Sequence, residues 1–355
     1  MIKVPAQLKQ TLDRIRGLNE EAMRQAEHRL DRLTKPPGSL GRLEEIAVQL
    51  AGITGELNPD LSGKAVIVMA GDHGVCAEGV SAFPSEVTPQ MVLNFLHGGA
   101  AVNVLARQAG AEVVCVDIGV NAELSHPGLT ARNVRKGTGN IAKGAAMSRE
   151  EAVQAICVGA ELVDGMAQRG VRLFATGEMG IGNTTPSSAL TAVFTGIELE
   201  AVVGRGTGIG DDILAHKRNV IRRAIEVNRP NAADPIDTLA KLGGLEIAGL
   251  VGVILGAAAN GCPVVIDGFI SSAAALVASR IAPLSVPYMI PSHLSQELGH
   301  RLLMEHIGLR PVLQLDMRLG EGTGAVIAFP IVEASVKLMN EMATFESAGV
   351  SEKQA

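Results

Sequence analysis

The chain has 355 residues, a hydrophobic content of 47% and a formal net charge of −6 at pH 7. The hydrophobic content excludes a disordered chain, and the length allows either one large domain with an accessory element or two domains. The acidic balance, with no run of Lys or Arg longer than a pair, argues against a nucleic-acid partner. With 41 Gly, 7 Phe, 1 Tyr and no Trp, the composition suits an α/β enzyme better than a β-sandwich.

The sequence shows no sign of a membrane or secretion segment. Its first residues lack an apolar stretch, and the longest apolar run, residues 247–259, is too short and too rich in Gly to span a bilayer. The four Cys, at positions 76, 115, 157 and 262, lie in apolar stretches without C-x-x-C spacing. We therefore expect reduced core cysteines in a cytoplasmic protein with no membrane partner.

The first 55 residues are rich in charge and have helical periodicity from residue 6 onward. The segment 34–41, "TKPPGSLG", interrupts this pattern, because Pro36 and Pro37 cannot continue a helix. We expect two or three amphipathic helices that lie outside a sheet.

From Lys64 onward, short apolar runs alternate with helical stretches, which predicts a parallel sheet covered on both faces. The helical stretches include 148–170, which opens with a capping box from Ser148 to Glu151, and 211–228. The expected strands are 64–71, 111–119, 171–177, 263–268, 286–291 and 311–316.

Polar residues follow five of these strands. In open α/β sheets ligands bind beyond the carboxyl ends of the strands, so the five clusters outline one candidate site. Each cluster taken alone is also compatible with simple helix capping. The residues are Asp72 and His73; Glu178, Asn183, Thr184 and Thr185; Asp267; Ser292 and His293; and Glu321.

Two glycine stretches resemble nucleotide fingerprints. "GRGTGIGDD" (204–212) fails the G-x-G-x-x-G/A spacing, but it can form a nest of backbone N–H groups for a monophosphate, with Lys217 one to two helical turns further on. A flexible turn is the alternative interpretation.

The second stretch, "GEGTGA" (320–325), fits G-x-G-x-x-A, but the further strand and acid of a dinucleotide fold do not follow it. Glu321 would also stand where the pyrophosphate belongs. We therefore take Glu321 as the functional group, positioned by glycines that allow a ligand to approach the backbone.

"GDHGV" (71–75) raises the question of a metal bound by Asp72 and His73. No H-x-x-x-H, H-x-H or C-x-x-C spacing accompanies these two residues. We favour a hydrogen-bonded structural pair and predict no metal site.

Taken together, eight strings over almost the whole chain resemble the nicotinate-nucleotide–dimethylbenzimidazole phosphoribosyltransferase family, which makes α-ribazole phosphate for the lower ligand of cobalamin. Their length and order make the resemblance specific. They are "KPPGSLGRLE", "AGDHGV", "EGVSAFP", "TGEMGIGNTT", "GRGTGIGDD", "DGFISSAAAL", "PSH" and "LGEGTGA".

The resemblance implies a homodimer of Rossmann-like α/β subunits with a doubly wound, mostly parallel sheet. It implies a small helical domain from residues 1–62 with 331–355, and a catalytic domain from 63–330. The implied reaction converts nicotinate mononucleotide and 5,6-dimethylbenzimidazole into α-ribazole 5′-phosphate and nicotinate, with inversion at C1′ and without a cofactor or metal.

The resemblance also implies the roles of individual residues. Glu321 matches the family's general base. The phosphate and ribose contacts carry over to Glu178, Gly180, Gly206, Thr207, Lys217, Asp267 and Ser292. The benzimidazole contacts carry over to Ser81, Phe83, Gln90, Met179 and Leu319. A nucleotide-dependent oxidoreductase and a non-catalytic nucleotide-binding module are the alternatives.

Overall fold

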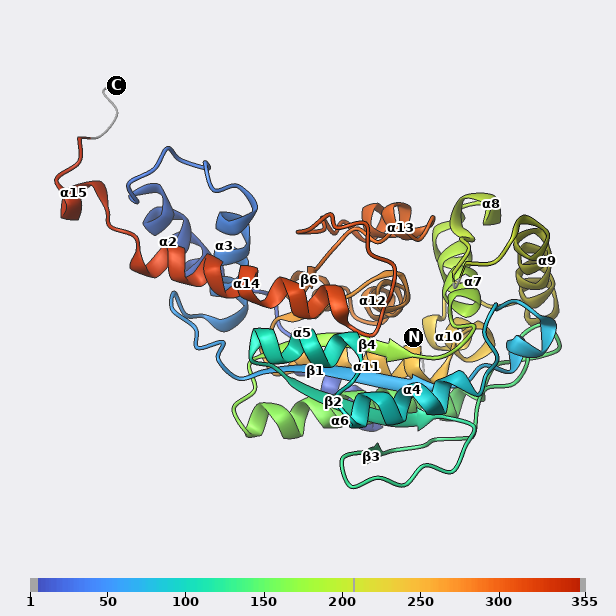
Figure 1. Cartoon of the computed structure of the whole chain (residues 1–355). Helices are drawn as coiled ribbons and strands as arrows, with labels where there is room; N and C mark the ends of the chain where they lie inside the picture. The colour runs from blue at the N-terminus through green and yellow to red at the C-terminus, as the bar shows by residue number, and fades with distance from the viewer. Residues whose placement is uncertain (1–5, 207, 352–355) are drawn as a thin grey trace.

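The computed structural model describes residues 6–206 and 208–351, and over these residues the chain forms a parallel sheet with helices on both faces (Figure 1). The strand order in the six-stranded sheet of this part of the chain is β3-β2-β1-β4-β5-β6. Because β1 pairs with both β2 and β4, the order reverses between β1 and β4, as in a doubly wound fold. The strands are β1 Lys64–Gly71, β2 Glu112–Gly119, β3 Thr130–Ala131, β4 Leu173–Met179, β5 Val264–Ile266 and β6 Met289–Pro291.

Alternate residues of β1 face the two helical layers, as the two-residue period of a strand requires. Ile67 and Met69 belong to the apolar cluster of the face covered by α6 (Arg149–Gln168) and α11 (Leu245–Ala259). Val66 and Val68 belong to the cluster of the face covered by α5 (Ala101–Ala109) and α14 (Thr323–Glu341). Both faces of the sheet are therefore buried, which explains the continuous apolar strands.

The helices on the face covered by α6 and α11, and the helices beside them, contribute most residues of the larger apolar core. The elements are α6 Arg149–Gln168, α7 Thr184–Thr195, α8 Leu199–Val202, α9 Asp211–Asn228, α10 Pro235–Leu242, α11 Leu245–Ala259, α12 Phe269–Ile281 and α13 His300–Ile307. The opposite layer holds α4 Val87–Leu96, α5 Ala101–Ala109 and α14 Thr323–Glu341, and the 3₁₀ segments are η1 Gly74–Glu78 and η2 Pro283–Tyr288.

The high glycine content has a structural use where α6 crosses α11. A Cβ atom at Gly252 would lie 1.9 Å from the backbone oxygen of Ile156, and one at Gly159 would lie 2.0 Å from the backbone oxygen of Gly249. The two backbones are therefore in direct contact, which only glycine allows.

Residues 20–54 and the end of α14 pack together in a small cluster of helices beside the sheet (Figure 1). In it α2 Glu20–Asp31 and α3 Arg42–Thr54 pack against the last turns of α14, with Leu30, Ala47 and Met339 in the shared core. The short α15 Phe345–Ala348 follows, and α1 Ala6–Leu12 instead packs on α6 and α11.

The predicted α/β fold is confirmed, and the helix expected at 211–228 has those bounds in α9. The capping box from Ser148 to Glu151 is present at the start of α6. The strand expected at 311–316 was wrong, because this segment makes a single bridge, between His293 and Leu313. Asp316 in it has a φ of 54°, which no strand tolerates. The short β3 was not predicted.

The cysteines are free in the described residues, and three of them, Cys115, Cys157 and Cys262, are buried, whereas Cys76 is partly buried. The expected core position is therefore confirmed for three of the four cysteines. Among the helices of residues 6–206 and 208–351, none combines the length and the apolar character needed to cross a membrane.

Candidate active site

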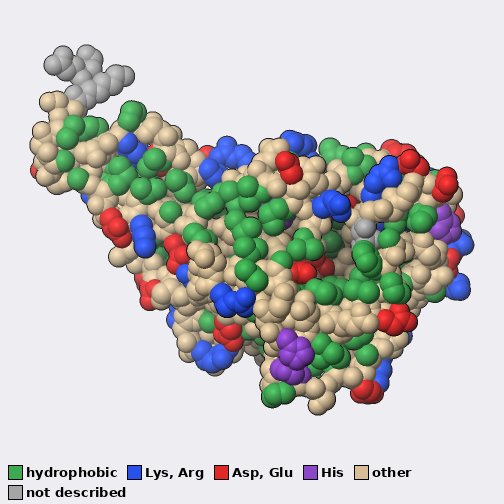
Figure 2. Space-filling model, in the orientation of Figure 1, with side chains coloured by type: hydrophobic (Ala, Val, Ile, Leu, Met, Phe, Trp, Pro, Cys, Tyr) green, Lys and Arg blue, Asp and Glu red, His purple; other side chains and the backbone are tan. Residues whose placement is uncertain are grey.

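A cavity of about 440 Å³ lies at the carboxyl ends of the strands, beside the point where the strand order reverses. It is lined by residues that follow β4, β5 and β6 and by residues of the glycine loop before α14. Figure 2 shows the face that holds this hollow, with acidic side chains inside it. Four of the five predicted polar clusters contribute to the lining through Glu178, Asp267, His293 and Glu321.

The glycine loop holds Glu321 in a conformation that its side chain alone would not favour. Gly320, Glu321 and Gly322 have φ values of 86°, 63° and 93°, so three successive residues are left-handed. A Cβ at Gly322 would stand 2.6 Å from Cγ2 of Val66 and 3.1 Å from Cα of Gly177. The loop therefore lies directly on β1 and β4, and this contact fixes the position of Glu321.

The carboxylate of Glu321 is 7% exposed and accepts a hydrogen bond from the backbone N–H of Val102, 3.4 Å from Oε2, at the start of α5. Burial raises the pKa of Glu321; the Val102 N–H opposes this rise and the negative charge of Asp267 adds to it. A carboxylate with a raised pKa beside a cavity is suited to general-base chemistry near neutral pH.

Glu178 stands near the end of β4 and is buried. Its Oε2 accepts a hydrogen bond from the Asn183 amide, and its Oε1 accepts one from the backbone N–H of Glu321 at 3.4 Å. Burial, reinforced by the charge of Asp267, raises the pKa of Glu178 to about 8. At pH 7 this side chain is mostly protonated and can donate a hydrogen bond.

Asp267 follows β5 and ties the glycine loop to the sheet. Its oxygens accept hydrogen bonds from the backbone N–H groups of Gly322 at 3.0 Å and Ala325 at 3.1 Å, at the start of α14. Burial raises the pKa of Asp267, while His293, 4.0 Å away, and these backbone donors act against the rise. Asp267 is thus the acid that caps α14, and the carboxylate of Glu321 is free for another role.

Lys217 lies at the other end of the site. It is 1% exposed, and its Nζ donates a hydrogen bond to Oγ1 of Thr184 at 2.6 Å. A Cβ at Gly206, whose φ is 51°, would lie 2.9 Å from the same Oγ1 and 3.4 Å from Nζ of Lys217. Burial lowers the pKa of Lys217 to about 8. The glycine stretch and the lysine are therefore adjacent, as the predicted monophosphate site requires.

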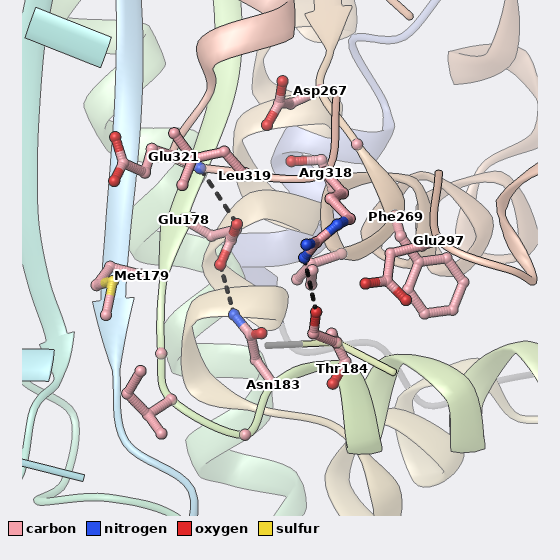
Figure 3. A pocket seen from close by; sticks show the side chains of 18 of the residues that line it. Glu178, Met179, Asn183, Thr184, Asp267, Phe269, Glu297, Arg318, Leu319 and Glu321 are labelled. Carbon is pink, nitrogen blue, oxygen red and sulfur yellow. Dashed lines mark hydrogen bonds between the residues drawn. The ribbon is translucent and has the colours of Figure 1, made fainter. Parts of the chain in front are cut away.

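Figure 3 shows these two ends of the cavity: Glu321 and Met179 lie on one side, Thr184, Glu297 and Arg318 on the other, and Glu178 between them. Of the residues assigned to base binding, Ser81, Phe83, Met179 and Leu319 line the cavity. Phe83 and Leu319 are 52% and 59% exposed, which places them at the mouth.

Of the predicted substrate contacts that the structure describes, three do not line the cavity: Lys217, Gln90 and Ser292. Lys217 instead contacts Thr184, which does line it. Gln90 is exposed on α4, and its neighbours Val87 and Met91 line the cavity in its place. Ser292 is fully buried, with its Oγ 3.0 Å from Nδ1 of His293, which itself faces the cavity. Thr207 lies outside the described residues.

Sequence reasoning missed several lining residues, among them Val87, Met91, Phe269, Glu297 and Arg318. The first two stand four positions apart on one helix, so helical spacing from Phe83 and the start of α4 could have found them. Glu297 and Arg318 lie in loops that carry no recognisable pattern.

Asp72 and His73 do not form the predicted hydrogen-bonded pair, because each side chain bonds to a different partner. His73 Nε2 lies 2.7 Å from Oε1 of buried Glu246, and Oδ2 of Asp72 accepts from the backbone N–H of Asn121 at 2.8 Å. Across residues 6–206 and 208–351, no group of three or more His, Cys, Asp or Glu is arranged to hold a metal ion.

Comparison with known proteins identifies the family. A family model described as phosphoribosyltransferase matches residues 15–350. The sequence is 58% identical over 346 residues to the nicotinate-nucleotide–dimethylbenzimidazole phosphoribosyltransferase of Desulforamulus reducens, which spans 97% of this chain and 99% of that protein. The chain belongs to this phosphoribosyltransferase family.

Other members of the family are similar to this chain over nearly its full length. The protein of that name from Chloroflexus aggregans is 58% identical over 348 residues, 98% of this chain and 99% of the relative. The crystal structure of the Thermus thermophilus phosphoribosyltransferase superposes with a TM-score of 0.90 at 48% identity, covering 95% of this chain and 100% of that one.

Family membership confirms the resemblance predicted from the eight strings and with it a phosphoribosyltransferase activity. It disfavours the oxidoreductase alternative. The structure agrees, because the described chain after the 320–325 loop contains α14 and α15 and no strand for a dinucleotide fold.

Proposed function

We propose that this chain transfers the phosphoribosyl group of nicotinate mononucleotide to 5,6-dimethylbenzimidazole, with inversion at C1′, giving α-ribazole 5′-phosphate and nicotinate. The observation that carries the proposal is a buried carboxylate with a raised pKa, Glu321, in a cavity whose two ends differ. One end has apolar side chains at its mouth, and the other has a glycine loop beside buried Lys217.

Glu321 is the proposed general base. Neutral benzimidazole carries one nitrogen with a lone pair and one N–H group. As the first nitrogen attacks C1′ of the ribose, the N–H becomes acidic and requires an acceptor within hydrogen-bond reach. Glu321, which lines the cavity near Met179 and Leu319, provides that acceptor.

Asp267 and Glu178 are the proposed ribose contacts. Inversion requires the base to attack from the face opposite the departing nicotinate, while positive charge develops on the sugar. A negatively charged Asp267 would stabilise that charge. Glu178, whose pKa is about 8, would act as a hydrogen-bond donor to a ribose hydroxyl in its protonated form.

The proposed phosphate contacts are Gly180, Gly206, Thr207 and Lys217, of which Gly180 and Gly206 line the cavity. Backbone N–H groups in a glycine turn and an adjacent lysine form a typical site for a monophosphate. The proposed role of Ser292 is indirect, since its hydroxyl contacts His293.

Ser81, Phe83, Met179 and Leu319 are the proposed base contacts, because apolar and sulfur-containing side chains suit a flat aromatic ligand. Gln90 would reach the base only from the rim, since it is exposed.

We further propose that the protein is a cytoplasmic homodimer and that residues 1–62 with 331–355 form a small domain beside a catalytic domain of 63–330, with α1 of the small domain packed on α6 and α11 of the catalytic domain. The dimer is the assembly that the family resemblance implies, and Leu93 and Val104 are exposed apolar side chains that a partner subunit would be able to cover.

Product identification tests the proposal. The purified protein is incubated with nicotinate mononucleotide and 5,6-dimethylbenzimidazole, and the products are separated and assigned by mass and by the configuration at C1′. We expect α-ribazole 5′-phosphate and nicotinate in equal amounts. Binding of the base without any turnover would instead favour a non-catalytic binding module.

A further inference from the structure

A carboxylate of the protein itself occupies the glycine stretch assigned to phosphate. Half-buried Glu297 lines the cavity, and the backbone N–H of Gly206 lies close enough to its carboxylate to lower the pKa of that group. A Cβ atom at Gly204 would stand only 2.4 Å from Oε2 of Glu297. The carboxylate therefore lies against the glycine stretch, beside a backbone N–H group that would otherwise be available to an oxyanion.

Two cations near this loop, Lys217 and Arg318, act electrostatically on the same carboxylate. Burial raises the pKa of Glu297, and the positive charges of Lys217 and Arg318 act against that rise. Arg318 also donates a hydrogen bond to the backbone oxygen of Gly206 at 3.4 Å. Figure 3 shows Glu297 and Arg318 on the side of the cavity where Thr184 accepts the hydrogen bond from Lys217.

We propose that Glu297 is an internal competitor for phosphate, so that a phosphate group binds to this loop only by exchange with the Glu297 carboxylate. The inference rests on the phosphate site of the proposed function. Two anions cannot share one glycine nest and one lysine, because their repulsion in a partly buried site is large. Glu297 thereby lowers the affinity of the site for phosphate groups in general.

This arrangement makes the site select mononucleotides over inorganic phosphate. Inorganic phosphate brings no further contacts and competes poorly with a carboxylate that is attached to the protein. A mononucleotide displaces Glu297 because its ribose and base add contacts elsewhere in the cavity. The same competition assists departure of the product, which carries the same phosphate group as the substrate.

Two variants remove the competitor by different means. Glu297→Gln keeps the shape and an acceptor oxygen for the Gly206 N–H but removes the charge. Gly204→Ala keeps the charge but adds a methyl group 2.4 Å from Oε2 and 3.3 Å from the backbone nitrogen of Leu298. Gly204 is not in the left-handed region, so the backbone accepts alanine, and the flexible carboxylate yields first. Glu305→Gln, an exposed position of α13, is the matched charge control.

The experiment measures inhibition by inorganic phosphate and the KM values of the mononucleotide and of dimethylbenzimidazole. We expect Glu297→Gln to lower the phosphate inhibition constant and the mononucleotide KM by about tenfold, as expected for one close charge in a partly solvated site. The KM for dimethylbenzimidazole should not change, Gly204→Ala should shift the first two values in the same direction, and Glu305→Gln should leave all three unaltered.

A mononucleotide KM that is unchanged or raised in Glu297→Gln would overturn the inference, because the carboxylate would then not compete with the phosphate group. Lys217→Met separates this failure from failure of the proposed function. If Lys217→Met weakens phosphate inhibition but Glu297→Gln has no effect, the phosphate site stands and the competitor is refuted. If Lys217→Met has no effect, the phosphate site itself is refuted, together with the inference.

Discussion

Replacing buried Lys217 by Met should stabilise the protein while weakening phosphate binding. Met matches the length and volume of Lys but carries no charge. Burial lowers the pKa of Lys217 from 10.5 to about 8, so the unfolded chain binds the proton more tightly than the folded chain. At roughly 1.4 kcal/mol for each factor of ten, charging Lys217 costs the folded state about 3 kcal/mol at pH 7.

The sign of the pH dependence follows from these values. The cost is fully present below pH 8 and disappears as the pH rises towards 10.5, so wild-type stability gains about 3 kcal/mol over this window. Met also leaves Oγ1 of Thr184 without the donor 2.6 Å away, a loss of about 1 kcal/mol. The net expectation is that Lys217→Met is about 2 kcal/mol more stable at pH 7 and lacks the gain above pH 8.

The assay combines urea unfolding at about pH 7 and about pH 9.5 with steady-state kinetics. Loss of a charge-assisted hydrogen bond to phosphate should raise the mononucleotide KM by roughly 10- to 100-fold, with the KM for the base unchanged. A variant that is less stable than wild type at both pH values, or that retains a wild-type mononucleotide KM, would refute the reasoning.

Two further predictions concern the base pocket and the glycine loop. Benzimidazole lacks two methyl groups, each of which would gain about 0.8 kcal/mol on burial. Its kcat/KM should therefore be roughly 3- to 15-fold below that of 5,6-dimethylbenzimidazole. Equal kcat/KM values for the two bases would count against a pocket lined by Phe83, Met179 and Leu319. Gly322→Ala should lower kcat by at least about tenfold, because the new Cβ would lie 2.6 Å from Val66 and displace Glu321. Gly308 is also left-handed but has open space around it, so Gly308→Ala should lower stability without lowering kcat. Equal kcat values in the two glycine variants would disprove this role of the loop.

The parts of the site that lie on strand ends could be predicted from the sequence. Apolar runs followed at once by Glu178 or Asp267 indicate both the strand and the edge at which the acid lies. Glu321 could be singled out because an acid is out of place in a phosphate-binding glycine turn. In each case the sequence pattern is local, and the parallel sheet brings the predicted side chains to one edge.

The features that could not be predicted from the sequence depend on contacts between residues that are distant along the chain. The segment 311–316 has the composition of a strand, but its residues are at most partly buried and it pairs at a single position. Glu297 reaches Gly206 from a loop far along the chain, and no pattern predicts that approach. The role of Asp267 as the cap of α14 also depends on two elements that are distant in sequence.

The pH–rate profile of Glu321→Gln tests the central claim most directly. Gln keeps the shape of the side chain but cannot accept the benzimidazole proton, and loss of a general base typically lowers the rate about 10²- to 10⁴-fold. Because burial raises the pKa of Glu321, wild-type kcat should fall as the pH drops below that pKa, and the variant should lack this acidic limb. The fold should survive, since Asp267 caps α14. Near-normal turnover with a lowered melting temperature would contradict the account and reduce Glu321 to a carboxylate that caps α5 through Val102.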